Sequence, residues 1–280
     1  GPARGSSPGA SGGGASGTTS GAPWRVPGAI GDPGLRYGPV SMPAVFVHGV
    51  PETHRIWDPL RSHLSRADHV ALDLPGFGSI RPGGFEATKD AYVEWLVAEL
   101  EGVGEPVDLG GHDWGGGLVL RVVSTRPDLV RTWASDFVAC AAPDFAWHDF
   151  ARIWQTPGDG EAFWEQQLAA KDDWRDGLVA MGVPADAAAS MADRVDATMT
   201  ACILDLYRSA VDIATEWGAA VDGIEVPGMA VVATDDPFIE QGWTESVAER
   251  AGARTQELGG QGHWWMLTDP AMAAAILESF

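Results

Sequence analysis

The stretch that most constrains the fold of this chain is residues 111–116, Gly-His-Asp-Trp-Gly-Gly. It follows a short apolar run at 107–110 and precedes a helical-looking apolar stretch at 118–123, which together predict a strand, a tight turn and a helix. The spacing small-x-nucleophile-x-small is typical of a turn so sharp that only glycine clears the neighbouring backbone. Glycine holds both small positions here, so Asp113 is the predicted nucleophile at the tip of the turn.

An aspartate at this position restricts the chemistry. A serine alkoxide attacks acyl carbon, whereas a carboxylate is a poor acylating group but a competent displacer at strained or activated saturated carbon. The expected substrate is therefore an electrophilic sp3 carbon, as in an epoxide or an alkyl halide. The alternative is that Asp113 only caps the helix that follows it, because aspartate is a frequent N-cap residue.

Length and composition indicate a single globular protein. A chain of 280 residues suffices for one α/β domain with an insertion, and 45% hydrophobic with 20% charged residues is typical of soluble domains. The net charge of -21 argues against nucleic acid or an anionic membrane as a partner, because phosphate binding needs clustered Lys and Arg.

Cysteine usage and hydropathy bear on location. Cys140, in an expected strand, and Cys202, in an expected helix, fit buried reduced thiols better than a disulfide framework or a metal site, which indicates the cytoplasm. No apolar run approaches the eighteen residues of a membrane span, and the first residues lack the pattern of a signal peptide.

The first part of the chain has little capacity to form a core. Residues 1–23 are almost entirely Gly, Ser, Ala, Thr and Pro, so we expect a flexible tail or linker there. Glycine and proline also interrupt residues 24–42, in which only 24–26 and 35–37 are strand candidates.

From residue 44 onward, apolar runs of strand length alternate with helical stretches, which predicts a doubly wound and mostly parallel sheet. The expected strands are 44–47, 70–72, 107–110, 133–140, 228–234 and 255–258. The expected helices are 57–64, 87–101, one over 118–123, one ending near 250 and 270–279.

The alternation stops between residues 144 and 218. This segment is rich in Trp and Ala and reads as helical, with breaks at 157–158 and 182–184. We expect it to be a helical cap above the active-site end of the sheet, and residues 24–143 and 219–280 to form the α/β core. Most of its aromatic side chains should build the interior of the cap, and a subset should line the pocket.

An ester formed on Asp113 must be hydrolysed by water that a general base deprotonates. His263, in a glycine-flanked loop after the last expected strand, is the predicted base, since its ordinary pKa lies near neutral pH. Asp236 is the predicted acid that orients it, with Asp235 or Asp144 as substitutes. The order nucleophile, acid, histidine agrees with the turn motif.

Hydrolysis of the ester develops negative charge on the carbonyl oxygen of Asp113, so two backbone donors are needed there. The expected donors are the N–H of Trp114, at the start of the following helix, and the N–H of Val50, in the turn His48-Gly49-Val50-Pro51. Neither role depends on the side chain.

Three motifs carry a family resemblance: residues 48–51 (HGVP), 111–116 (GHDWGG) and 262–264 (GHW). They resemble the motifs of the α/β-hydrolase epoxide hydrolases and of the related haloalkane dehalogenases, over roughly residues 44–270. The resemblance implies an α/β-hydrolase fold with an Asp nucleophile. It does not choose between the two branches, because both carry a tryptophan after the nucleophile.

The leaving groups of the two branches differ. An opening epoxide needs a proton donor for its alkoxide, whereas a departing halide needs fixed N–H donors and no proton. Residues 204–208 (LDLYR) resemble the segment that carries a ring-opening tyrosine in epoxide hydrolases, which implies this role for Tyr207. Residues 147–150 (WHDF) resemble the cap-entry stretch of members that use a histidine, which makes His148 the second donor or else a buried structural histidine.

Other readings remain open. Val50 stands where many dehalogenases place a halide-binding asparagine, yet Trp114 with Trp154 or Trp164 could still hold a halide. A dehalogenase of the fluoroacetate type would carry arginine in place of Trp114. A degenerate hydrolase acting as a binding protein has no need of a triad, and an ordinary esterase is disfavoured by the aspartate.

The sequence therefore predicts a hydrolase that opens epoxides to vicinal diols, with haloalkane dehalogenation as the alternative. The expected ligand is a small apolar electrophile. We expect no metal, no organic cofactor, no nucleic acid and no membrane partner.

Overall fold

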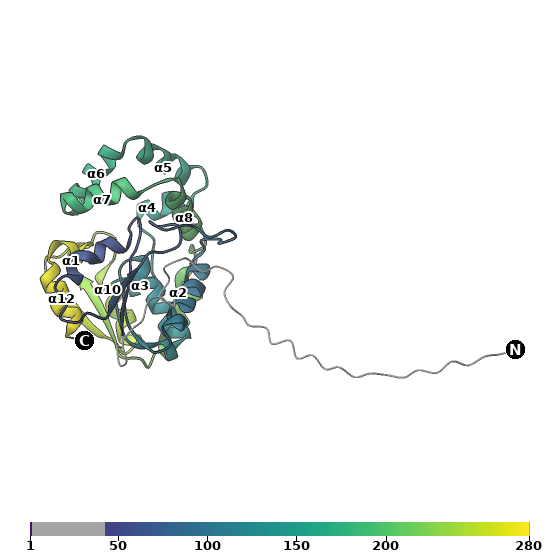
Figure 1. Cartoon of the computed structure of the whole chain (residues 1–280), viewed down its shortest axis with the longest axis vertical. Helices are drawn as coiled ribbons and strands as arrows, with labels where there is room; N and C mark the ends of the chain where they lie inside the picture. The colour runs from purple at the N-terminus through teal and green to yellow at the C-terminus, as the bar shows by residue number, and fades with distance from the viewer. Residues whose placement is uncertain (2–42, 280) are drawn as a thin grey trace.

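The computed structural model describes Gly1 and residues 43–279, so the expected tail and the strand candidates at 24–26 and 35–37 lie outside the described residues. Within the described part, six strands form one sheet in the order β2-β1-β3-β4-β5-β6 (Figure 1). The strands are β1 (Ala44–Val47), β2 (His69–Leu72), β3 (Val107–Gly111), β4 (Val130–Ser135), β5 (Gly228–Ala233) and β6 (Arg254–Leu258).

All five neighbouring pairs of strands are parallel. β1 and β5 are buried along their whole length, as expected for strands covered on both faces by helices. β1 lies between β2 and β3. From β1 the chain adds β2 on one side, and it then crosses to the other side and adds β3 to β6 in order. The carboxyl ends of parallel strands meet at one edge of a sheet, and in such folds that edge carries the ligand site.

Helices and short 3-10 turns connect the strands. Gly104, with a φ of 84°, ends the long helix α2, and α3 begins directly after the turn that follows β3. The helices that connect the strands or follow the last strand, apart from those between β4 and β5, are α1 (Asp58–Arg61), α2 (Lys89–Val103), α3 (Trp114–Thr125), α10 (Gln241–Arg250), α11 (Trp265–Thr268) and α12 (Pro270–Glu278). The 3-10 turns are η1 (His54–Trp57), η2 (Pro127–Leu129), η3 (Val138–Ala141) and η4 (Gly218–Gly223).

Two expected elements differ from the structure. The strand expected over 133–140 ends at Ser135, whose hydroxyl accepts the N–H of Phe137 and turns the chain, so Cys140 lies in η3 rather than in a strand. The helix expected over 57–64 is a 3-10 turn followed by four α-helical residues, and it ends where Ser62 bonds back to Pro59. Buried apolar runs do not distinguish a strand from a tight turn.

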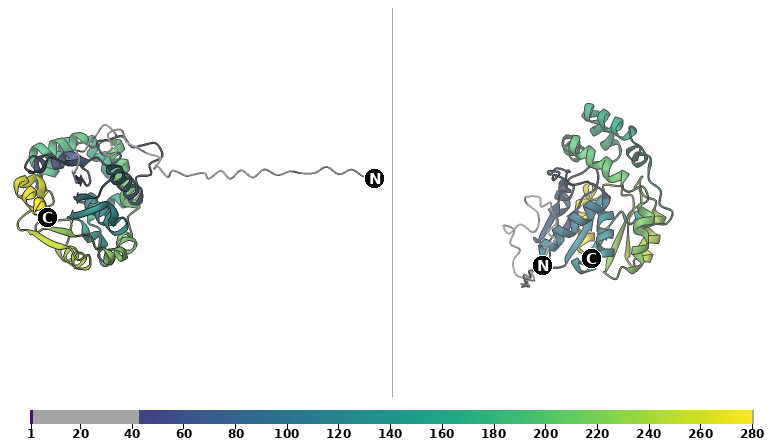
Figure 2. Two further views of the ribbon diagram at one scale, coloured as in Figure 1. Left: turned by 60° about the horizontal axis from the view of Figure 1, so that its bottom comes forward. Right: turned by 90° about the vertical axis from the view of Figure 1, so that its right-hand side faces the viewer.

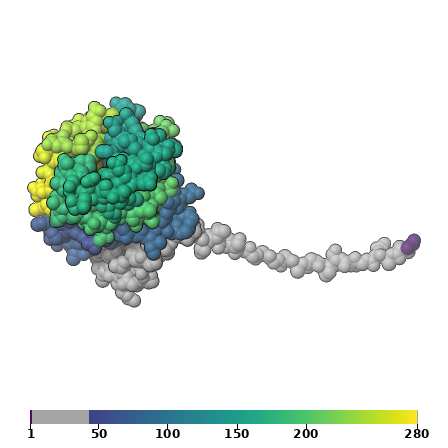
Figure 3. Space-filling view, turned by 90° about the horizontal axis from the view of Figure 1, so that it is seen from above, coloured from purple at the N-terminus to yellow at the C-terminus, as the bar shows by residue number. Residues whose placement is uncertain are grey.

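The segment between β4 and β5 is helical, and it breaks at the expected positions 157–158 and 182–184. It also breaks at Ala170 and at 195–196, which were not expected. Five of its helices, which we call the helical layer, lie over the carboxyl edge of the sheet (Figures 1 and 2). Seen from above, this segment spreads across the face of the molecule in Figure 3. The layer consists of α4 (Asp149–Gln155), α5 (Asp159–Ala169), α6 (Lys171–Ala180), α7 (Ala185–Arg194) and α8 (Ala197–Arg208), and α9 (Ile213–Trp217) follows it.

The described part of the chain contains no helix whose length and apolar character would let it cross a bilayer.

Candidate active site

Asp113 stands in a strained turn between β3 and α3. Its backbone has φ 48° and ψ -125°, a conformation that side-chain-bearing residues rarely adopt. The turn has no space for larger neighbours: a Cβ on Gly111 would lie 2.4 Å from the carbonyl oxygen of Gly115, and a Cβ on Gly115 would lie 2.2 Å from that of Val47. The expected sharp turn is present, and it projects one carboxylate from the middle of the sheet edge.

The Asp113 carboxylate does not cap α3, since its side chain makes no capping hydrogen bond. Its Oδ2 instead accepts the N–H of Val50 at 2.8 Å, and the adjacent backbone N–H of Trp114 lowers the pKa of the carboxyl. Burial raises the pKa of Asp113 to about 6, against the opposing effects of the nearby His263 and His112. The expected donor Val50 is therefore hydrogen-bonded to this carboxylate, and the expected donor Trp114 begins α3 directly after it.

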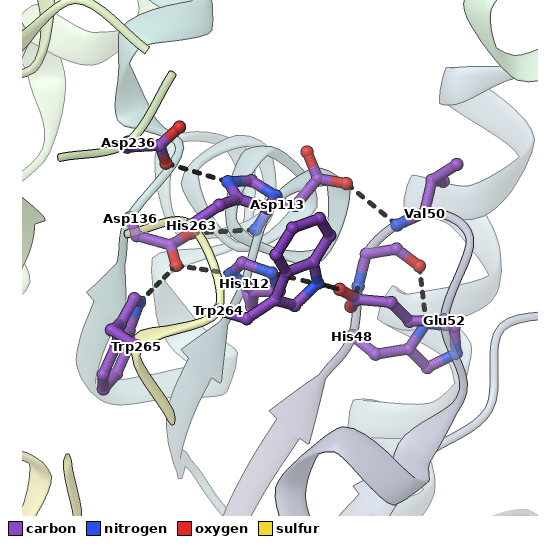
Figure 4. A network of polar contacts seen from close by, with 11 residues as sticks. His48, Val50, Glu52, His112, Asp113, Asp136, Asp236, His263, Trp264 and Trp265 are labelled. Carbon is purple, nitrogen blue, oxygen red and sulfur yellow. Dashed lines mark hydrogen bonds and ion pairs between the residues drawn. The ribbon is translucent and has the colours of Figure 1, made fainter. Parts of the chain in front are cut away.

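His263 lies beside Asp113 in a loop between β6 and α11 (Figure 4). Its Nδ1 is 2.8 Å from Oδ2 of Asp236, and the other oxygen of Asp236 accepts the N–H of Phe238 at 2.8 Å. The alternatives Asp235 and Asp144 are both exposed. Among the three acids considered, the structure thus pairs Asp236 with the histidine.

The pKa values of this pair move apart. Burial alone would lower the pKa of His263, but the adjacent Asp236 outweighs burial and raises it. The pKa of Asp236 is lowered, because its bonds to His263 and to a backbone N–H outweigh the effect of burial. An ionised Asp236 that accepts from Nδ1–H leaves Nε2 of His263 as the basic nitrogen.

Tyr207 and His148 reach the same cavity from the helical layer. Tyr207 lies on α8 and is buried, with its ring 5.4 Å from that of Trp114 and 6.4 Å from that of His148. Burial raises the pKa of Tyr207 well above its ordinary value, so it keeps its proton. His148 is the N-cap of α4, and its Nδ1 accepts the N–H of Ala151 at 3.2 Å.

The capping bond decides the proton position on His148. A nitrogen that accepts a hydrogen bond carries no proton, so the neutral ring carries it on Nε2. Burial lowers the pKa of His148 to about 4, which keeps the ring neutral at physiological pH. His148 is therefore both a helix cap and an N–H donor, and the two readings of its role are compatible.

A cavity of about 40 Å³ joins these groups, with a mainly apolar and aromatic wall. The indole N–H groups of Trp114, Trp154 and Trp174 are buried and have no acceptor among the described residues. The cavity is lined by Val50, Pro51, Asp113, His148, Phe150, Trp154, Trp174, Leu178, Met181, Tyr207, Phe238, His263 and Trp264.

Three further polar residues lie behind the nucleophile, and sequence reasoning assigned them no role. His112 has its Nδ1 2.6 Å from Asp136 and its Nε2 3.2 Å from Glu52, and all three are buried (Figure 4). Their positions in the sequence could have identified them, because Glu52 and Asp136 follow β1 and β4 at the same sheet edge as Asp113. Asp136 was missed because the strand was expected to continue to residue 140, which would have placed Asp136 inside the strand rather than at its end.

Part of the chain is similar to curated enzymes of different activities. It is 40% identical over 97 residues to the lipase LipV of Mycobacterium tuberculosis, covering 34% of this chain and 37% of the lipase. It is 30% identical over 154 residues to a haloalkane dehalogenase of Bradyrhizobium diazoefficiens, covering 48% of each. Both matches span less than half the length of the relative.

The fold is shared with solved structures over most of the chain. The haloalkane dehalogenase DbeA from Bradyrhizobium elkani superposes with a TM-score of 0.68 at 20% identity, covering 86% of this chain and 92% of that one. The model of a family described as "Alpha/beta hydrolase family" matches residues 44–276. With its parallel sheet, its strained turn and this match, the chain belongs to the alpha/beta hydrolase family.

Proposed function

We propose that this hydrolase opens small apolar epoxides to vicinal diols through an ester on Asp113. One oxygen of the Asp113 carboxylate attacks the less hindered ring carbon, and the C–O bond of the epoxide breaks. Tyr207, with His148, gives a proton to the departing oxygen. The product of this first step is a hydroxyalkyl ester of Asp113.

In the second step, His263 takes a proton from a water that attacks the carboxyl carbon of the ester. The N–H groups of Val50 and Trp114 stabilise the resulting oxyanion, because Val50 already donates to this carboxylate and Trp114 directly follows Asp113 at the start of α3. Collapse of the intermediate breaks its ester C–O bond, and the protonated His263 gives its proton to the leaving alkoxide oxygen, which releases the diol. The acid proton left on Asp113 returns to the donor that was ionised in the first step, so the carboxylate is regenerated with one oxygen from water.

The observation that carries the proposal is the pair of neutral donors opposite the nucleophile. The Tyr207 hydroxyl and the His148 imidazole line the same cavity as Asp113, and burial keeps each in its uncharged, proton-bearing form. An epoxide oxygen needs such a donor. A departing halide needs no proton, and the leaving alcohol of an ester can take its proton from the catalytic histidine, so neither requires Tyr207 or His148.

A second candidate is haloalkane dehalogenation, and the unpartnered indoles favour it. The N–H groups of Trp114 and Trp154 are buried beside Tyr207 without acceptors, and a halide ion would satisfy them. The curated relatives include haloalkane dehalogenases as well as a lipase, so they support a hydrolase but leave the substrate open.

A trapping experiment separates the candidates. We expect His263→Gln to form the ester and to fail to hydrolyse it, so intact mass and peptide mapping should reveal a hydroxyalkyl adduct on Asp113 after incubation with terminal epoxides. An alkyl adduct from 1-haloalkanes alone would instead assign the dehalogenase. The absence of an adduct from either panel would rule out Asp113 as the nucleophile of both candidates.

The donors are tested in the same assay with matched variants. Tyr207→Phe should slow adduct formation from epoxides by about 10²-fold or more, because the alkoxide loses its proton source. Tyr92→Phe is the control: it removes another buried hydroxyl, one that bonds to the carbonyl of Pro75 away from the cavity. Equal rates for the two variants would remove Tyr207 from the reaction.

A further inference from the structure

A buried ion cluster lies one layer behind the nucleophile. It consists of His112 with Glu52 on one side and Asp136 on the other, and His112 and Glu52 have no exposed surface. The three side chains come from different parts of the fold: the turn after β1, the turn after β3 and the end of β4. We call this set the His112 cluster.

The geometry of the cluster places a carboxylate against each ring nitrogen of His112. Nδ1 of His112 faces Oδ2 of Asp136 at 2.6 Å, and Nε2 faces Oε1 of Glu52 at 3.2 Å. Each neutral tautomer of imidazole carries one proton, so a neutral ring would direct a lone pair at one of the two carboxylates. Only the imidazolium presents an N–H to each acid: Nδ1 is hydrogen-bonded to Asp136, while Nε2 lies within ion-pair distance of Glu52 without the geometry of a hydrogen bond.

The two carboxylates are occupied by donors on their other sides. Asp136 accepts the N–H of Asp113 at 2.8 Å and the indole N–H of Trp265 at 2.8 Å. Glu52 accepts the N–H of Gly49 at 2.9 Å and the indole N–H of Trp264. Both acids are therefore surrounded by donors, as an ionised acceptor requires.

These bonds connect the cluster to the reacting groups. Asp136 holds the backbone N–H of the nucleophile, and Glu52 holds the N–H of Gly49, the residue before the Val50 donor. The ring of His112 lies 4.6 Å from the ring of His263, centroid to centroid. The His112 ring thus contacts Asp136, which holds the nucleophile, and Glu52, which holds the Val50 turn. It also lies next to the predicted base His263.

We propose that His112 is a permanently cationic positioning residue, which holds the Asp113 turn and the Val50 turn together and sets the charge states of Asp113 and His263. This inference rests on the proposed ester mechanism for its kinetic consequences and on the geometry alone for the charge of His112. His112 is buried and does not line the cavity, so it acts through Asp136 and Glu52 rather than on the substrate.

The electrostatic direction follows from the groups that face the ring. Glu52, Asp113 and Asp136 are acidic, and His263 is the other imidazole packed against it. Burial would lower the pKa of His112, but Asp136 and Glu52 outweigh burial and raise it well above its ordinary value. The charge of His112 in turn lowers the pKa of Asp113 and of His263. It therefore favours the ionised nucleophile and the neutral base, which are the reactive forms.

The first test is spectroscopic and needs no substrate. Histidine-selective ¹⁵N labelling of the full chain, with His112→Gln used for assignment, should show both ring nitrogens of His112 protonated from pH 5 to pH 9. A neutral-tautomer signal at pH 7 would overturn the proposal whether or not the chain is an epoxide hydrolase.

The second test compares two variants with opposite expected shifts. His112→Gln removes the cation, so the acid limb of the rate of ester formation should move to higher pH, by roughly one unit or more. Glu52→Gln removes a negative charge while Asp136 keeps His112 protonated, so the limb should move to lower pH. In the wild type the limb should lie near the pKa of Asp113, about 6.

If His112 had a packing role alone, the variants would lower the rate equally at every pH, and the acid limb would stay at the same pH in both. That result would overturn the proposal. If His112→Gln does not fold, the pH profile of Glu52→Gln still decides. If no substrate is turned over, the proposed function fails, and the spectrum of His112 still tests the charge independently.

Discussion

At the scale of the residue, Asp113 shows how reactivity opposes stability. Its φ of 48° and its buried carboxylate both cost free energy, on the order of 1–3 kcal/mol for such a backbone. Glycine adopts this conformation without strain, so Asp113→Gly should unfold at higher denaturant than Asp113→Ala, by roughly 1 kcal/mol. The usual order of these two residues is the reverse in a helix.

Urea unfolding followed by circular dichroism measures the difference, and both variants should be inactive towards epoxides. A more stable alanine variant would show that the turn imposes no strain on this position.

At the scale of the element, the junction between β3 and α3 depends on the absence of side chains. A Cβ on Gly115 would lie 2.2 Å from the carbonyl oxygen of Val47 on β1, so Gly115→Ala must displace the helix or the strand. We expect a loss of several kcal/mol or failure to fold. Gly177→Ala in α6 is the matched control, because nothing lies within 4 Å of its added Cβ.

Since alanine has the higher helix propensity, Gly177→Ala should raise the free energy of unfolding by about 0.5–1 kcal/mol. Unfolding midpoints of the two variants test the contrast. Equal midpoints would mean that α3 does not pack against β1 as closely as described.

At the scale of the whole molecule, the His112 cluster joins the turns after β1, β3 and β4, its acids accept the indole N–H groups of Trp264 and Trp265, and it should govern acid stability. The pKa of Glu52 is lowered from 4.5 to about 2, since its pairing with His112 outweighs burial. A lowered carboxyl pKa contributes stability that is complete above about pH 4.5 and is lost as the pH falls towards 2. The stability advantage of wild type over Glu52→Gln should therefore shrink by roughly 3 kcal/mol between pH 5 and pH 2.

Denaturant unfolding at a series of pH values measures this advantage, with the exposed Glu165→Gln as the control variant. An advantage that does not change with pH would show that Glu52 is not ionised through its contact with His112.

Local patterns of the sequence predicted much of this protein. The alternation of apolar runs with helical stretches predicted the α/β sheet, and the glycine spacing around Asp113 predicted the sharp turn, because each pattern is complete within about fifteen residues. Asp236, His263, Tyr207 and His148 were predicted from short motifs. The structure brings His263, Tyr207 and His148 to one cavity with Asp113, and Asp236 is bonded to His263 outside that cavity. Their catalytic roles stay predictions.

The pairing of acids with histidines was decided only by the tertiary structure. Asp236 and Asp136 follow the neighbouring strands β5 and β4, so both end near the same edge of the sheet. Strand register directs Asp236 to His263 and Asp136 to His112, and it places Glu52 on the far side of that ring. Such partners are far apart in the sequence, and hydrogen bonds depend on tenths of an ångström, which residue spacing does not specify.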